Sequence, residues 1–172
     1  VDPETGADLS AGTAGLLLAK GPNVMKGYLG EEAKTAEVLR GGYYVTGDIA
    51  AIDEDGFVTI TDRLSRFSKI GGEMVPHILV EDKLHELAGR VERSFVVTAV
   101  PDPGRGERLV VLVKDFADTG GLWKRLQDAG LPKLWIPGKD AFHPVADFPL
   151  LGSGKIDMPA LQARARELEG AP

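Results

Sequence analysis

The stretch Asp62-Arg63-Leu64-Ser65-Arg66-Phe67-Ser68-Lys69 marks a change in the character of the chain. It is polar and basic, it follows a segment whose pattern predicts strands and turns, and it leads into the pair Gly71-Gly72. We therefore place a domain boundary near Leu64–Ser65. The sequence predicts a β-rich piece over residues 1–64 and a second domain over residues 65–172.

Upstream of the boundary, short apolar runs alternate with turn residues. Residues 15–19 predict a strand, and residues 31–39 predict one or two helical turns. Residues 43–60 predict a hairpin around Asp53-Glu54-Asp55-Gly56, because an Asp-Gly pair between apolar runs favours a tight turn. A calcium loop of the EF type is rejected, since its first and twelfth positions would be Ala51 and Asp62.

Downstream of the boundary, the pattern predicts a mixed domain. Apolar residues at helical spacing behind Pro76 predict a helix from Pro76 to about Leu87. Strands are predicted at 94–100, 109–113 and 141–146, a helix around 122–129, and a last helix that Asp157 caps. The order β-α-β-β-α-β-α from residue 66 indicates a small α+β domain.

Composition limits the classes of function. The net charge of −6 argues against a nucleic-acid partner. No run reaches the roughly 18 apolar residues that cross a membrane. The chain has no cysteine, and His77, His85 and His143 lack the spacing of a metal site, so we predict no protein-bound metal.

The start of the chain adds two expectations. No signal peptide is recognisable behind Val1, so we expect a cytoplasmic protein, or a parent at the cytoplasmic face of the inner membrane. Because the chain does not begin with Met, we also expect an excised piece of a longer protein.

Asp48, in Thr46-Gly47-Asp48, is a candidate nucleotide ligand. An ionised carboxylate accepts hydrogen bonds through two oxygens and can hold two neighbouring hydroxyl groups, as on a ribose. The alternative is a turn aspartate. Arg63 lies across the predicted hairpin, so it can pair with Asp48 or reach a ribose or phosphate oxygen. Its alternative is a surface arginine beside Asp62.

Lys155 is the candidate catalytic residue. It ends Gly152-Ser153-Gly154-Lys155, which is not a P-loop, since Pro149 replaces the first glycine and Ile156 the magnesium-binding hydroxyl. A lysine on such a loop can meet a transient negative charge; the alternative is a solvated surface lysine. Gly71-Gly72 allows close approach of a ligand or forms a simple loop.

Together these features resemble the adenylate-forming superfamily of acyl-CoA synthetases, luciferases and peptide-synthetase adenylation domains. The similarity follows the family order over nearly the whole chain. The matching stretches are Gly21–Leu29, Tyr44–Asp48, Asp53–Phe57, Asp62-Arg63, Lys69–Glu73, Val100–Asp102 with Gly106-Glu107, and Gly152–Asp157. Within the superfamily, residues 66–75 and 148–155 are most similar to the bifunctional 2-acylglycerophosphoethanolamine acyltransferase/acyl-acyl-carrier-protein synthetases.

The resemblance implies a role for each candidate residue. Asp48 would hold the ribose hydroxyls of ATP, and Arg63 would assist at the nucleotide. Lys155 would bridge the attacking carboxylate and the α-phosphate. Gly71-Gly72 would line the channel of the thiol acceptor. Ser65 matches the family hinge, where Asp or Lys is usual, and a small polar residue there can still absorb a backbone rotation.

The resemblance also implies a reaction. The chain would be the carboxy-terminal fragment of a fatty acid ligase that forms acyl-AMP from ATP, with Mg²⁺ on the phosphates. The acyl group would then pass to the thiol of an acyl carrier protein or CoA. The alternatives are an acyl-CoA or aryl-CoA ligase of other specificity, and a non-catalytic module that docks a carrier protein.

Two expectations follow from this reaction. The phosphate loop and acyl pocket belong to an upstream large domain, so we expect the isolated chain to be inactive. Since a carrier protein is acidic, we predict a basic patch near the channel, with Arg66, Lys69 and Arg105 as its members.

Overall fold

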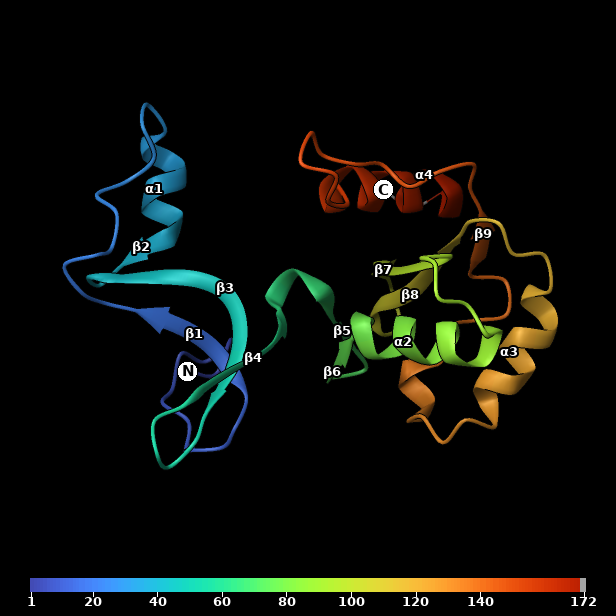
Figure 1. The fold of residues 1–172 in the computed structure, drawn as a ribbon, viewed down its shortest axis with the longest axis horizontal. Helices are drawn as coiled ribbons and strands as arrows, with labels where there is room; N and C mark the ends of the chain where they lie inside the picture. Colours follow the sequence, from blue (N-terminus) through green and yellow to red (C-terminus); the bar gives the residue numbers. More distant parts are fainter. Residues whose placement is uncertain (171–172) are drawn as a thin grey trace. The chain divides into compact units, whose positions relative to one another are not determined.

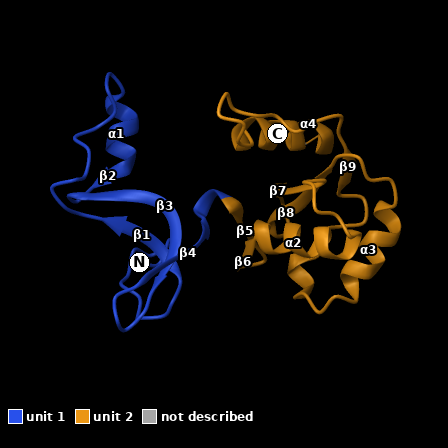
Figure 2. Cartoon of the chain, viewed as in Figure 1, with its two compact units in different colours: residues 1–65 blue, residues 66–172 orange. Residues whose placement is uncertain are grey.

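The computed structural model describes residues 1–170 and contains two compact units, Val1–Ser65 and a second that begins at Arg66 (Figure 2). Strand β4 (Val58–Arg63) belongs to the sheet of the first unit, and β5 (Phe67–Ile70) belongs to the sheet of the second. A single 3₁₀ turn, η1 (Leu64–Arg66), lies between these two strands. The predicted α+β class is confirmed.

The first unit is a small antiparallel sheet with one short helix. Its other elements are β1 (Gly15–Ala19), α1 (Glu32–Val38), β2 (Leu39–Arg40) and β3 (Tyr43–Ile52). Strand β3 pairs with β1, β2 and β4, and every pair is antiparallel. The predicted strand, helical turns and hairpin are therefore confirmed, and the hairpin extends beyond residue 60 to Arg63.

The turn between β3 and β4 is held by its own first acidic residue. The carboxylate of Asp53 accepts the backbone N–H groups of Asp55 at 3.0 Å and Phe57 at 2.8 Å. Gly56 has φ 87°, a left-handed conformation that favours glycine. The acidic cluster therefore shapes the hairpin.

Apolar side chains lie exposed around this hairpin. Phe57 is 72% exposed and Ile60 is 60% exposed, whereas Ile49 and Ala50 of β3 are buried. Gathered apolar side chains of this kind are typical of contact surfaces.

The second unit packs helices on both faces of a five-stranded sheet (Figure 1). Its other elements are β6 (Glu73–Pro76), α2 (His77–Ala88), β7 (Phe95–Asp102), β8 (Gly106–Val113), α3 (Thr119–Gln127), the 3₁₀ turn η2 (Lys133–Trp135), β9 (Phe142–Pro144) and α4 (Met158–Glu169). The strand order is β6-β5-β8-β7, with antiparallel pairs, and β9 pairs with β8 in parallel.

Two apolar clusters fill the spaces on either side of this sheet. Phe95, Val97 and Val111 belong to the cluster that contains side chains of α2 and α3. Val96 and Val110 belong to the other cluster, which contains side chains of α4. Successive residues of a strand point to opposite faces. A strand covered on both faces has a continuous apolar run, which is why residues 109–113 were correctly predicted as a buried strand.

The start of the second unit differs from the prediction. The sequence predicts one strand between residue 66 and the first helix, whereas the structure has the hairpin β5–β6. Gly71 and Gly72 have φ values of 59° and 91°, and two left-handed residues are what a tight two-residue hairpin turn requires. Pro76 lies just outside α2 as its N-cap residue and ends β6, rather than occupying the first turn.

The last helix follows its prediction closely. The side chain of Asp157 accepts the N–H of Ala160 at 3.1 Å, so it caps α4 as expected. Leu161 and Ala165 of this helix are buried against the sheet. Among the helices within residues 1–170, none is both long and apolar enough to cross a bilayer.

Candidate functional site

Asp48 and Arg63 lie opposite each other on neighbouring strands of the first unit. The register of β3 and β4 pairs the two residues, and Arg63 Nε donates to Asp48 Oδ1 at 2.7 Å. The arginine also reaches the carbonyl oxygen of Thr46 at 3.5 Å. Of the alternatives left open for Arg63, the structure has the ion pair with Asp48.

The backbone around Asp48 is fixed by Thr46 and Gly47. The hydroxyl of Thr46 donates to the carbonyl of Leu17 in β1 at 2.8 Å and accepts the N–H of Asp48 at 3.0 Å. Gly47 has φ 76°, which side chains rarely adopt. Because neighbouring strands hold this tripeptide, the carboxylate has a defined direction.

The carboxylate of Asp48 is mostly buried, whereas the guanidinium of Arg63 is mostly exposed. The side chain of Asp48 is 19% exposed, and that of Arg63 is 63% exposed. Among the described residues, the contacts of the carboxylate use Oδ1, so Oδ2 can accept a hydroxyl from a ligand. The exposed guanidinium can donate to a second oxygen of the same ligand. The pair therefore fits a ribose or a similar diol.

Lys155 stands at the base of a small loop of the second unit. Leu150 and Ile156 form an isolated antiparallel bridge, and Leu151 N donates to the carbonyl of Lys155 at 2.8 Å. Gly154 closes the loop with φ 79°. The three-residue loop 152–154, which ends with a left-handed glycine, is a common hairpin form, so the small residues before Lys155 have a structural use as well.

The side chain of Lys155 is exposed to solvent. Within the described range 1–170, no salt bridge or hydrogen bond engages its ammonium group. The hydrogen bonds of the loop hold the backbone of Lys155 in place, while its ammonium group lies in water. Such a group is suited to bind an incoming phosphate oxygen.

Gly71 and Gly72 form the exposed turn of the β5–β6 hairpin. Gly71 N donates to the carbonyl of Arg105 at 2.9 Å, so this turn lies beside the turn between β7 and β8. A Cβ at Gly71 would lie 3.5 Å from Leu134, whereas a Cβ at Gly72 would have nothing within 4 Å. Space for a ligand is therefore open at Gly72.

Ser65 is exposed within the turn η1 and is the last residue of the first unit. Its role as a hinge stays a prediction.

Arg66 corrects the predicted basic patch. Its side chain is 11% exposed and forms a short ion pair with Glu81 of α2. Burial raises the pKa of Glu81, while the charge of Arg66 and the N–H of Val97 oppose that rise. Lys69 and Arg105 remain exposed. Arg66 is therefore unavailable to a partner, and a basic patch that includes Lys69 and Arg105 stays a prediction.

The ion pair between Arg66 and Glu81 is what sequence reasoning missed. A signal was present, because Glu81 stands four residues after His77 and three before Leu84, on the face of α2 that is buried. A charged residue on a buried helical face requires a partner.

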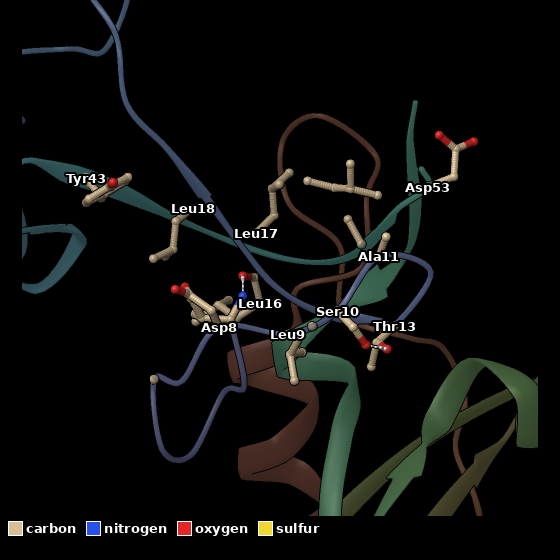
Figure 3. A pocket seen from close by; sticks show the side chains of 15 residues that line it. Asp8, Leu9, Ser10, Ala11, Thr13, Leu16, Leu17, Leu18, Tyr43 and Asp53 are labelled. Atoms are coloured by element: carbon tan, nitrogen blue, oxygen red, sulfur yellow. Dashed lines mark hydrogen bonds between the residues drawn. The ribbon is translucent and has the colours of Figure 1, made fainter. Parts of the chain in front are cut away.

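The described part of the chain lacks a cluster of metal ligands, and it has a cavity away from Asp48 and Arg63. Residues 1–170 contain no group of three His, Asp or Glu side chains that could hold a metal ion. A cavity of about 640 Å³ in the first unit lies between the N-terminal segment and β1 (Figure 3). Leu9, Leu17 and Tyr43 line it, but Asp48 and Arg63 do not, so it is separate from the candidate nucleotide ligands.

Comparison with known proteins gives consistent matches, although no family model matches the chain. A feruloyl-CoA synthase of Amycolatopsis is 38% identical over 158 residues, which are 88% of this chain and 31% of that protein. ATP-bound MatB from Rhodopseudomonas palustris superposes with a TM-score of 0.78 at 28% identity, over 97% of this chain and 33% of that one.

A second solved structure adds a reaction intermediate. The o-succinylbenzoate CoA synthetase MenE from Bacillus subtilis, in complex with the acyl-adenylate intermediate OSB-AMP, has a TM-score of 0.72 at 26% identity. The match covers 90% of this chain and 31% of that one. The chain thus spans about a third of the length of the proteins it matches.

Proposed function

The chain belongs to the adenylate-forming superfamily and corresponds to the carboxy-terminal part of its members, so we propose that it works within an ATP-dependent acid–thiol ligase. The observation that carries this proposal is the Asp48–Arg63 pair, whose carboxylate keeps one oxygen for a ribose hydroxyl. The ATP-bound and acyl-adenylate-bound relatives support the same assignment.

The first half-reaction forms the adenylate. A carboxylate oxygen of the acid attacks the α-phosphorus of ATP, a P–O bond forms, and the bond to pyrophosphate breaks. Asp48 holds the ribose, Arg63 orients the nucleotide, and the ammonium of Lys155 offsets the charge that builds on the α-phosphoryl oxygens. Mg²⁺ belongs on the phosphates, since it binds mainly through substrate oxygens and water.

The second half-reaction uses a thiol. Its sulfur attacks the acyl carbonyl, a C–S bond forms, and AMP leaves as the C–O bond breaks. The open space at Gly72 is the proposed entrance for the arm that carries the thiol. CoA is the favoured acceptor, because the names of both the feruloyl and the o-succinylbenzoate relatives include it. Transfer to a carrier protein stays a prediction.

The acid is the least constrained part of the proposal. The relative named for the feruloyl group favours an aromatic acid. The fatty acid expected from the resemblance to acyl-carrier-protein synthetases is the other candidate.

The test uses the full-length protein that contains this chain. Acid-dependent pyrophosphate release is measured with a panel of fatty and hydroxycinnamic acids, and thioesters are identified by mass spectrometry with CoA or carrier protein present. We expect acyl-AMP and acyl-CoA from at least one acid, and loss of both in Asp48→Ala. A protein that releases no pyrophosphate with any acid contradicts the proposal.

A further inference from the structure

A buried polar cluster joins three elements at the start of the second unit. The guanidinium of Arg66 is paired with Glu81 of α2 through one terminal nitrogen and lies 3.1 Å from Met158 Sδ through the other. The paired oxygen of Glu81 also accepts the N–H of Val97 in β7 at 2.6 Å. Helix α2, strand β7 and the first residue of α4 therefore meet at Arg66.

Net stability is a weak explanation for this ion pair. Both side chains are 11% exposed, and removing two charges from water costs about as much as their attraction returns. Breaking one side of such a pair is different, because it leaves an uncompensated buried charge. The planar fork of arginine fixes the direction of its contacts. The pair is thus suited to fixing a geometry.

The contact with Met158 leads directly to Lys155. Met158 is the first residue of α4, and the preceding Asp157 donates its N–H to the carbonyl of Pro149 at 2.9 Å. The next pair along the loop is the bridge between Leu150 and Ile156. Each step is a backbone hydrogen bond or a direct contact, so the base of the Lys155 loop is built on the residue that Arg66 touches.

We propose that Arg66 is a positioning residue for Lys155, an inference that rests on the proposed function. Arg66 directly follows Ser65, the proposed pivot. A rotation at Ser65 therefore turns α2, β7 and the start of α4 as one body, and the ammonium of Lys155 moves with them. Without the guanidinium of Arg66, the Lys155 loop is no longer held in a fixed position relative to Ser65.

The first test measures both half-reactions in the full-length protein. Arg66→Met removes the charge and keeps the stem, and Arg66→Lys keeps the charge. We expect Arg66→Met to lower kcat for acyl-AMP formation about 10- to 100-fold. The KM for ATP and the transfer from supplied acyl-AMP to CoA should change less than about twofold, because Lys155 acts in the first transition state. Arg66→Lys should recover part of the loss, and Arg125→Met on the surface of α3 is the matched control.

The second test needs no catalysis and uses the 172-residue chain. In Arg66→Met, hydrogen exchange of the amides of residues 150–157 should accelerate at least about 10-fold, while β7 and β8 keep their protection. The double variant Arg66→Met/Glu81→Met leaves no unpaired charge and should fold even where the single variant does not. It should show the same local acceleration.

The two tests separate two kinds of failure. If exchange responds locally but the full-length protein forms no acyl-AMP, the proposed function fails and the positioning role stands. If acyl-AMP forms and Arg66→Met changes neither kcat nor loop exchange, the positioning role is wrong. A uniform rise in exchange over the whole second unit, with equal losses in both half-reactions, also overturns it.

Discussion

At the scale of single residues, Lys155 has the proposed role of offsetting the negative charge that builds during acyl-AMP formation. Lys155→Ala in the full-length protein should slow acyl-AMP formation on the order of 10²-fold, comparable to the removal of one preorganised donor. Transfer from supplied acyl-AMP should change little, since no bond to the α-phosphorus forms or breaks in that step. Pyrophosphate release and thioester formation, measured separately, check this. Lys139→Ala is the control, since Lys139 is also exposed.

His77 gives the second unit a defined response to acid. Burial, and then the charge of Arg66, lower the pKa of its imidazole to about 3 from 6.5. Below pH 6.5 the unfolded chain protonates this histidine while the folded chain does not, until about pH 3. The unfolded state therefore holds more protons in this window, and the free energy of unfolding falls as the pH falls.

Urea unfolding at pH 7.5 and 5.5 measures this effect. The contribution of His77 should fall by about 1 kcal/mol between these values, and His77→Asn should lack that part of the decrease. Burial raises the pKa of Glu81, so above its ordinary pKa of 4.5 Glu81 acts in the opposite direction. The comparison with His77→Asn isolates the histidine, because both proteins retain Glu81. An unchanged pH dependence in His77→Asn contradicts the prediction.

Some of these side-chain relations could be predicted and others could not. The closeness of Asp48 and Arg63 followed from the hairpin, but their direct pairing depends on a register shift between Ile49 and Ala50 that the turn alone does not predict. The burial of Arg66 did not follow, because its neighbours are polar and its partner lies in another element. Local pattern indicates exposure only where tertiary contacts do not override it.

Helices and strands differed in how well the sequence indicated them. The continuous apolar run of β8 and the capped start of α4 were found because each has a strong local signal. The hairpin β5–β6 was not found as two strands, because each strand has only four residues and the apolar residues of β5 are separated by Ser68 and Lys69. Its turn residues, Gly71 and Gly72, were interpreted either as a loop that a ligand approaches closely or as a simple loop.

The turn of this hairpin gives a prediction about the acceptor. Gly72→Trp in the full-length protein should slow thioester formation from supplied acyl-AMP, because the indole would fill the proposed entrance. It should spare pyrophosphate release. Gly72 has φ 91°, so any side chain strains the backbone; Gly72→Ala is therefore the control for strain. Equal effects of the two substitutions on transfer would argue against an entrance at this turn.

The two units together make a prediction about the isolated chain. Both apolar clusters lie in the second unit, and the sequence lacks the phosphate loop expected of an upstream domain. The purified 172-residue chain should therefore release no pyrophosphate from ATP and acid above a blank. The full-length protein is the positive control. Acid-dependent pyrophosphate release by the 172-residue chain alone would contradict the proposal that adenylate formation requires the upstream domain.

The carboxylate of Glu81 has a consequence for solubility. Strand β7 ends the strand order of its sheet, a position at which exposed backbone groups could pair with another polypeptide. In this protein Phe95, Val96 and Val97 are fully buried there. Glu81 accepts the N–H of Val97 on that strand. A foreign strand would have to displace a buried charge to pair there. We therefore expect Glu81 also to protect this end strand from pairing with another polypeptide.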